Sequence, residues 1–189
     1  MSNVQQQCKP PMRVLLACLL MSLVKAYLFG PFPLHSSQIF FETALSIGFV
    51  NLKPIVPGHV LIIPKRVEPR LTSLSPEEYH DLFSAVRLCA PVIERHCQAE
   101  ALNIAIQDGA AAGQSVPHVH VHILPRKLND FKRNDDVYDH LENQKLDEAF
   151  QQTDSQVDPT VERMPRSKEE MAAESAILRA LFEVNNTEL

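Results

Sequence analysis

Three histidines alternate with β-branched apolar residues near the middle of the chain, in the order His118, Val119, His120, Val121, His122 and Ile123. A neutral imidazole supplies a nucleophilic nitrogen, a proton donor and a phosphate ligand near neutral pH. Side chains on a strand point to alternate faces, so this spacing predicts one face that carries all the histidines and one apolar face. We interpret the segment as the catalytic strand of a sheet.

A metal site is the main alternative for these histidines. Histidines two positions apart on a strand can both bind one ion, but three side chains from one straight strand fit the tetrahedral geometry of zinc poorly. The cysteines form no pair with CxxC spacing and predict neither a disulfide framework nor a zinc site. They are Cys8, Cys18, Cys89 and Cys97. This usage is typical of a reduced intracellular compartment.

A hairpin is predicted upstream of the histidines. Its first strand covers residues 44–51, and its second, buried strand covers 59–63 and stops at Pro64. Between them, Pro57 and Gly58 suit the central positions of a type II turn, where glycine supplies the positive φ.

Another strand is predicted over residues 101–107, directly before the histidine segment. Asp108 and Gly109 end it, and a loop of small residues at 110–115 leads into the histidines. We expect the two strands to pair antiparallel, which would place Gln107 near the mouth of the histidine face.

Two capping boxes predict two helices. In the first, Ser75 stands at the N-cap, Pro76 at the first helical position and Glu78 at the third. Pro91 should kink this helix or end it early, because proline lacks an N–H. The second box is at 167–170. The apolar face of its helix is made by Met171, Leu178, Leu181 and Phe182.

The order of elements predicts an α+β class with an antiparallel sheet, because the strands come mostly as hairpins with helices between them. Residues 127–166 are polar and show no clear period, so we expect no regular element there. The 189 residues are 45% hydrophobic, which is enough for a core, and the net charge of −5 gives no support to nucleic-acid binding.

The first 41 residues contain no Asp or Glu, and an apolar run covers 14–24. This run is shorter than the roughly 20 residues that span a membrane, so we expect no membrane association of the domain. Residues 1–28 leave three alternatives: a dispensable extension, a targeting segment for an organelle, or a secretion signal. We expect a cytoplasmic protein, with mitochondrial targeting through residues 1–28 as the alternative.

Read with its surroundings, the histidine segment resembles the histidine triad (HIT) hydrolases of the fragile histidine triad branch. The triad signature lies at 118–124. The wider match consists of residues 50–54, 57–60, 107–109, 113–116, 125–127, 130–131, 133–138 and 169–174. The block at 133–138 and the closing helix separate this branch from the nucleoside phosphoramidases. The resemblance extends over residues 29–182.

This resemblance implies hydrolysis of dinucleoside polyphosphates, such as diadenosine triphosphate, to AMP and a nucleoside diphosphate. It implies a HIT-like fold with about five antiparallel strands and two main helices per subunit, and a sheet continued across a homodimer. The expected domains are an extension at 1–28, a HIT catalytic domain at 29–149, a flexible linker at 150–166 and a C-terminal helix at 167–183.

The resemblance also assigns roles to the histidines. His120 would attack the α-phosphorus and form a nucleotidyl-histidine, and its central position lets its neighbours flank one phosphorus. His122 would donate a hydrogen bond to an α-phosphate oxygen. His118 would assist the leaving group or orient its neighbours, and His59 would support the triad without touching the substrate.

The remaining expectations concern ligands. The substrate contacts implied by the resemblance are Asn51, Gln107, Gly113, Gln114, Ser115 and Val116, together with His122. We expect no metal ligand and no obligatory cofactor, although Mg²⁺ or Mn²⁺ bound to the polyphosphate should stimulate. Two other functions stay open: a sensor whose nucleotide-bound form signals to partners, and a nucleoside phosphoramidase.

Overall fold

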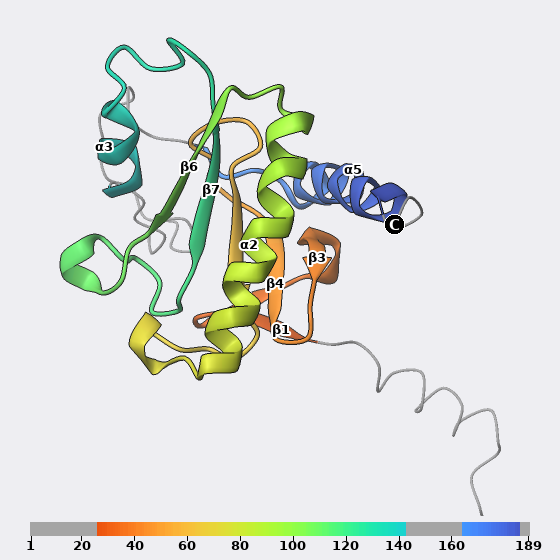
Figure 1. Cartoon of the computed structure of the whole chain (residues 1–189), viewed down its shortest axis with the longest axis vertical. Coiled ribbons are helices and arrows are strands. Elements are labelled where there is room, and N and C mark those ends of the chain that lie inside the picture. The colour runs from red at the N-terminus through yellow and green to blue at the C-terminus, as the bar shows by residue number, and fades with distance from the viewer. Residues whose placement is uncertain (1–25, 143–163, 186–189) are drawn as a thin grey trace, which may run out of the picture.

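The computed structural model describes residues 26–142 and 164–185 and contains one five-stranded sheet (Figure 1). The strands follow the order β3-β4-β5-β7-β6. Their bounds are Ile39–Glu42 for β3, Ser46–Val50 for β4, Val60–Pro64 for β5, Ala101–Ile106 for β6 and Val121–Arg126 for β7. Every neighbouring pair is antiparallel, which confirms the predicted α+β class and the pairing of β6 with β7.

The predicted hairpin is formed by β4 and β5. Its turn has Gly58 at a φ of 80°, and the His59 N–H donates to the carbonyl of Val56 at 3.1 Å, as a type II turn requires. The prediction that the second strand stops before Pro64 was wrong by one residue, because Pro64 still pairs with Ser46. A proline at a strand end lacks a donor but keeps its carbonyl acceptor.

Two long helices, α2 (Pro76–His96) and α5 (Lys168–Asn185), pack on one face of the sheet. Figure 1 shows α2 running across this face, with α5 at its side. Both predicted capping boxes form: Ser75 pairs with Glu78, and Ser167 with Glu170. The main hydrophobic core between helices and sheet includes Val60, Ile62, Leu82, Val86, Ile93, Val121, Ile123, Met171 and Leu178.

Pro91 does not end α2, which continues to His96. Of the two effects predicted for Pro91, the early end was therefore wrong, and the kink stays a prediction. Proline at this position deprives the carbonyl of Arg87 of its helical N–H partner. Both Pro91 and Arg87 are exposed, so water can solvate that carbonyl and the helix can pass the proline.

Two smaller elements, a hairpin and a short helix, pack on the opposite face of the sheet. A hairpin of β1 (Tyr27–Phe29) and β2 (Phe32–Leu34) packs over one part, in a cluster with Leu61 and Ile63. A short helix, α3 (Asp136–Glu142), packs over another part against Leu124. This helix falls inside the stretch that we expected to be irregular, so that expectation was wrong there. Its apolar anchors, Val137 and Leu141, are too few to show a helical period in the sequence.

The histidine segment is only partly a strand, because β7 begins at Val121. The prediction that His118, His120 and His122 all lie on one strand was therefore wrong, since only His122 is within it. The backbone N–H of Val119 donates to the carbonyl of Glu68, in a loop, at 2.7 Å. The alternation of faces holds nevertheless, because Val119 and Val121 both enter the main core.

The predicted extension at 1–28 and linker at 150–166 lie largely outside the described residues, and these boundaries stay predictions. Within the described ranges, no helix is long and apolar enough to cross a membrane.

Candidate active site

The triad histidines lie on the face of the sheet opposite α2, beside the β1–β2 hairpin. His122 on β7 stands directly across from Leu61 on β5 and from Ala105 on β6. The rings of His120 and His122 have centroids 4.8 Å apart. Phe29 packs on this cluster from the side of the β1–β2 hairpin. Its ring and that of His120 are perpendicular, at an interplanar angle of 90°, and their centroids are 5.2 Å apart.

His120 is held in one tautomer. Its Nδ1 lies 2.7 Å from the backbone carbonyl oxygen of His118. A carbonyl only accepts, so the ring proton must sit on Nδ1 and donate. The other nitrogen, Nε2, then carries a lone pair. His120 is therefore set up as a nucleophile through Nε2 without any base to deprotonate it.

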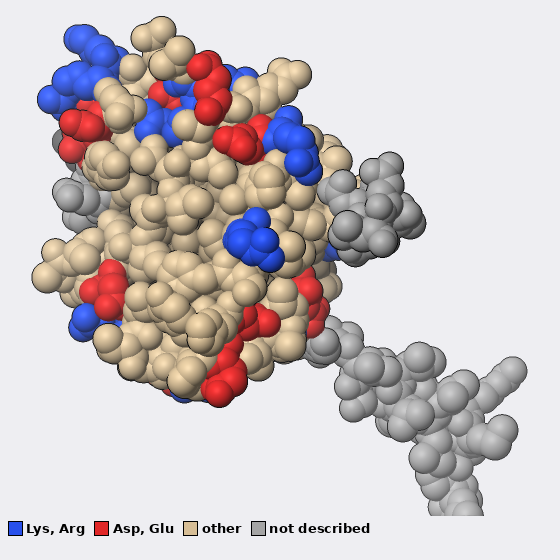
Figure 2. Space-filling view, viewed as in Figure 1, with Lys and Arg blue, Asp and Glu red and all other residues tan. Residues whose placement is uncertain are grey.

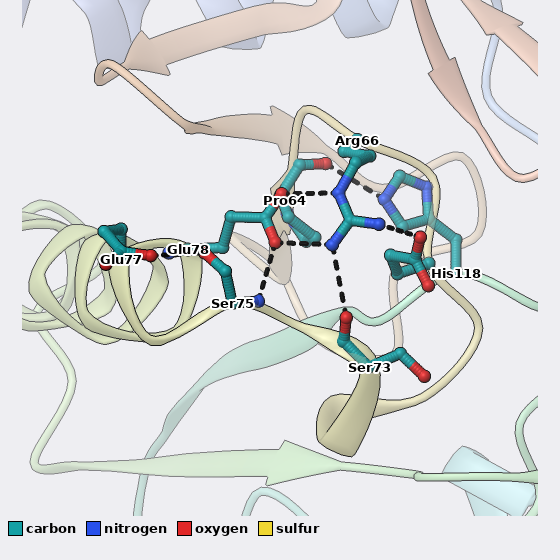
Figure 3. Close-up of polar contacts among 8 residues, drawn as sticks. Pro64, Arg66, Ser73, Ser75, Glu77, Glu78 and His118 are labelled. Atoms are coloured by element: carbon teal, nitrogen blue, oxygen red, sulfur yellow. Dashed lines mark hydrogen bonds and ion pairs between the residues drawn. The ribbon is translucent and has the colours of Figure 1, made fainter.

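His118 is fully buried, and both of its ring nitrogens are occupied. Nδ1 accepts the backbone N–H of Gly30 at 3.1 Å, and Nε2 donates to the carbonyl of Pro64 at 2.9 Å (Figure 3). This arrangement leaves no proton for a leaving group. Of the two roles expected for His118, the geometry fits orientation of its neighbours and does not fit assistance of the leaving group.

His59 and His122 form a chain of imidazoles. The backbone N–H of Ile55 donates to His59 Nδ1 at 3.1 Å, so the proton of His59 is on Nε2. That nitrogen lies 2.9 Å from Nδ1 of His122 and donates to it. His122 must then carry its own proton on Nε2. Among the described residues, this buried Nε2 has no hydrogen-bond partner, and it can donate to an oxygen of a ligand.

The pKa values support neutral imidazoles. Burial lowers the pKa of His118 to about 4. Burial also lowers the pKa of His120, against the opposing effect of its hydrogen bond to the His118 carbonyl. The pKa of His122 is held well below its ordinary value by burial and by the neighbouring histidines. All three rings are therefore uncharged at neutral pH, and the nucleophile keeps its lone pair.

The loop before the triad contains four of the predicted substrate contacts, and the structure gives them different surroundings. Gly113 is left-handed, with a φ of 85°. The Gln114 amide is already used within the protein, because it accepts from Gly109 N–H and donates to the carbonyls of Pro69 and His118. The Val116 side chain is fully buried. Ser115 is half-buried. The N–H groups of Gly113 and Gln114 already donate to the carbonyls of Ala110 and Gly109. The groups of this loop that remain suited to hold phosphate are thus the N–H groups of Ser115 and Val116 and the Ser115 hydroxyl.

The two predicted amide contacts are both buried. Asn51 follows β4, and its amide nitrogen lies 3.3 Å from Nδ1 of His59. Its carbonyl oxygen accepts the Lys53 N–H at 3.2 Å. Gln107 follows β6, directly after Ile106, which pairs with Val121. The paired strands therefore bring Gln107 close to the start of β7, as expected.

In the described part of the chain, no group of three or more His, Cys, Asp and Glu side chains is arranged to hold a metal ion. Each triad ring is held by a different neighbour.

The sequence model of the HIT domain matches residues 34–129. The chain belongs to the HIT family. This HIT protein is 46% identical over 157 residues to a bis(5'-adenosyl)-triphosphatase of Dictyostelium discoideum, and the match covers 83% of this chain and 93% of that protein. It is 48% identical to a bis(5'-nucleosyl)-tetraphosphatase (asymmetrical) of Schizosaccharomyces pombe, over 84% of this chain and 95% of that protein.

A solved structure agrees with this assignment of the fold. The HIT protein superimposes on the diadenosine triphosphate hydrolase of Plasmodium falciparum, crystallised with cyclomarin A, with a TM-score of 0.65. The two are 28% identical, and the match covers 84% of this chain and 85% of that one. The predicted HIT-like fold is confirmed.

Several residues that shape the HIT site were missed from sequence. The backbone N–H of Gly30, the carbonyl of Pro64 and the N–H of Ile55 fix the tautomers of His118 and His59. These residues act through backbone N–H and carbonyl groups, which nearly every residue type has, so their side chains do not indicate the role. The one available sign was Gly30, whose φ of 57° favours glycine.

Proposed function

We propose that this HIT protein hydrolyses dinucleoside polyphosphates, of the diadenosine triphosphate kind, to AMP and a nucleoside diphosphate through a covalent intermediate on His120. The observation that carries the proposal is the hydrogen bond from His120 Nδ1 to the His118 carbonyl at 2.7 Å, which leaves the lone pair on Nε2. Its similarity to a bis(5'-adenosyl)-triphosphatase and to a bis(5'-nucleosyl)-tetraphosphatase supports this substrate class.

In the first step, Nε2 of His120 attacks the α-phosphorus. A phosphorus–nitrogen bond forms, and the bond from phosphorus to the bridging oxygen breaks. The nucleoside diphosphate leaves as an anion. Because the second pKa of a phosphate monoester is about 6, this leaving group needs no proton at neutral pH. That fits the occupied ring of His118.

In the second step, water attacks the same phosphorus, the phosphorus–nitrogen bond breaks, and the proton that the water loses passes to the solvent. AMP is released, and His120 recovers its lone pair. In both steps the Nε2 proton of His122 donates to a non-bridging oxygen of the α-phosphate, where charge gathers in the transition state. The N–H groups of Ser115 and Val116 and the Ser115 hydroxyl hold the phosphates, and Asn51 and Gln107 contact the ribose and phosphate.

The stereochemical course tests the covalent step. Two in-line displacements at one phosphorus retain configuration, whereas one displacement inverts it. Hydrolysis of a substrate chiral at the α-phosphorus should therefore give AMP with net retention. Quenched enzyme should also carry an acid-labile nucleotidyl adduct. Net inversion would rule out His120 as the nucleophile and leave it as a base that activates water.

A substitution gives an independent test. His120→Ala should lower kcat by several orders of magnitude while substrate binding survives, because no neighbouring nitrogen can attack in line. His122→Ala should be milder, at about 10²–10³ in kcat, the loss typical of one donor to a developing oxyanion. Equal losses for both variants would contradict the assigned roles.

Steady-state kinetics separate the hydrolase from the two other functions. A kcat near the enzyme median of about 10 per second would support hydrolysis as the function of the protein. Very slow turnover with tight binding would favour a sensor. Adenosine phosphoramidate as the single good substrate would establish a phosphoramidase. Comparison of diadenosine triphosphate with the tetraphosphate in the same assay gives the preferred chain length.

The proposed chemistry needs no bound metal, because the nucleophile is a ring nitrogen. Exhaustive chelation should leave measurable hydrolysis, and added Mg²⁺ or Mn²⁺ should raise the rate by neutralising the polyphosphate. Stoichiometric zinc that survives chelation and is required for activity would overturn this proposal.

We further propose that the protein is a homodimer with paired β6 strands. β6 lies at an edge of the sheet, and its Ile104 is 50% exposed. On α2, Leu88 is 47% exposed. Figure 2 shows that uncharged side chains cover much of the broad face over α2 and β6, with one Lys/Arg patch over the middle of α2. Light scattering should give twice the chain mass, and Ile104→Lys should give a monomer. A wild-type monomer would contradict the proposal.

A further inference from the structure

The 64–69 loop starts at Pro64, the last residue of β5, and presents backbone carbonyls to the histidine segment and to the loop before it. The three bonds join Pro64 O to His118 Nε2 at 2.9 Å, Glu68 O to Val119 N at 2.7 Å and Pro69 O to Gln114 Nε2 at 2.9 Å. The carbonyl of His118 accepts the hydrogen bond from Nδ1 of His120, so the conformation of this loop determines where the nucleophile lies.

Arg66 holds this loop in shape (Figure 3). Its guanidinium donates two hydrogen bonds to the carboxylate of Glu78, at 2.7 and 2.6 Å. It also binds the carboxylate of Glu68, within the same loop, and the carbonyl of Ser73 at 3.2 Å. A bidentate pair of this kind fixes direction as well as distance.

In the Arg66–Glu78 pair, Glu78 is the residue held in place by a helix. It lies in the first turn of α2 and is 8% exposed. Its hydrogen bonds from Arg66 and from the Ser75 N–H lower the pKa of its carboxyl group to about 2. The carboxylate is therefore ionised throughout the neutral range and joins the loop to a long helix that packs on the sheet.

We infer that the Arg66–Glu78 ion pair is a positioning device for His120, acting through the 64–69 loop and His118. The inference rests on the proposed function for its kinetic consequence. The hydrogen bonds of these two side chains go to the loop, to Ser73, to Ser75 and to each other and not to a triad ring, so both are positioning residues. If the loop shifts, the Glu68 carbonyl that holds the Val119 N–H moves, so the adjoining His118 shifts relative to Pro64, and the carbonyl that orients His120 Nδ1 moves with it.

The competing explanation is that the pair merely stabilises the start of α2. A matched control separates the two. Ser75 Oγ accepts the backbone N–H of Glu78 at 3.2 Å and caps the helix. Ser75→Ala removes that cap and leaves the Arg66–Glu78 pair intact. Arg66→Met removes the pair and leaves the cap intact. A second control is Lys65→Met. Lys65 forms an ion pair with Glu42 and donates to the carbonyl of Thr43 in the β3–β4 turn, and the substitution removes both interactions.

Kinetics on diadenosine triphosphate form the first arm. Arg66→Met should lower kcat about 10- to 100-fold with KM changed less than about threefold, as expected for a nucleophile misplaced by a fraction of an ångström. Arg66→Lys and Glu78→Gln, which keep part of the pairing, should fall between Arg66→Met and wild type. Ser75→Ala and Lys65→Met should lower the melting temperature but keep kcat. Equal kcat in all five variants would overturn the inference.

Nuclear magnetic resonance of ¹⁵N-labelled histidines forms the second arm and does not depend on turnover. In wild type, His118 should appear as the Nε2–H tautomer with slow exchange of that proton. Arg66→Met and Glu78→Gln should speed this exchange at least about tenfold, whereas Ser75→Ala should not. If wild type fails to hydrolyse any dinucleotide, the proposed function fails but this arm still decides the positioning role. Unchanged exchange in the Arg66 and Glu78 variants would refute it.

Discussion

His59 donates its Nε2 proton to Nδ1 of His122 across 2.9 Å, although His59 lies just before β5, His122 lies on β7, and the two are 63 positions apart in the chain. The Ile55 N–H on the other side of His59 gives this bond its direction. As a result, the proton of His122 is available on the nitrogen that faces the site. The role of His59 is thus to decide which nitrogen of His122 donates.

His59→Phe should lower kcat about 10²–10³-fold, as much as His122→Ala, because an unheld His122 no longer presents its Nε2 proton to the α-phosphate. The double variant should be little worse than either single one, since both remove the same donor. The measurement is kcat on diadenosine triphosphate, with ¹⁵N shifts to report the His122 tautomer. His80→Phe, at an exposed position, serves as the control. A full-rate His59→Phe enzyme would contradict the assigned role.

The stability of the protein should fall as the pH drops from about 6.5 to about 4. Burial lowers the pKa of His118 to about 4 in the folded state, whereas an unfolded histidine has a pKa of about 6.5. Between these values the unfolded chain binds the extra proton, so acid favours unfolding. Below the lower value the loss from this residue is complete, at about 3 kcal/mol.

Urea unfolding at several pH values from 7 to 4 measures this loss. His118→Gln cannot take up the proton, so its unfolding free energy should depend less steeply on pH over the same window. The comparison uses slopes because the substitution also lowers stability at every pH. Parallel curves for the two proteins would show that His118 titrates normally.

Gly58→Ala should destabilise the turn that precedes His59. Gly58 has a φ of 80°, and a Cβ there would stand 2.2 Å from the sulfur of Cys97. The left-handed backbone costs about 1–2 kcal/mol for a residue with a Cβ, and overpacking adds about 1–3 kcal/mol. Cys97→Ala removes the clashing sulfur but leaves the backbone strain.

The double variant Gly58→Ala/Cys97→Ala should therefore be less destabilised than the sum of the two single variants. Urea unfolding of all four proteins completes the cycle. Strict additivity would mean that the turn moves away from Cys97 and that the contact does not restrict position 58.

Removal of residues 1–26 should leave activity within about threefold of the full chain, because the described contacts with the triad begin after them. Removal of residues 1–31 should abolish most activity. That longer deletion takes away Phe29, which packs on His120, and the Gly30 N–H that binds His118. Equal activity of the two truncated chains would show that the β1–β2 hairpin has no part in the site.

The local sequence determined the elements whose signals are contained within a few neighbouring residues. Ser75 and Ser167 mark the helix starts because a cap bonds only three positions along the chain. Pro57-Gly58 marks the hairpin turn because only glycine is at ease at that φ. The alternation of Val119, Val121 and Ile123 marked the core face because side chains on an extended backbone point alternately to its two sides.

The sequence also identified the family through the histidines, but it misplaced the strand that carries them. Whether a segment is a strand depends on which backbone groups it finds as partners. Val119 finds Glu68 in a loop, and β7 begins two residues later. In the same way, the exposure of Pro91 allowed α2 to continue, and exposure is a property of the packed molecule.

Only the tertiary structure decided the protonation of each imidazole. The types and spacing of the histidines determined that three rings would gather at one site. The groups that assign a proton to each nitrogen are the backbone of Gly30 and Pro64, distant in sequence from His118, and the chain from Ile55 through His59 to His122. A hydrogen-bond partner selects a tautomer only when folding holds it within about 3 Å, so residue types alone could not reveal which nitrogen attacks and which donates.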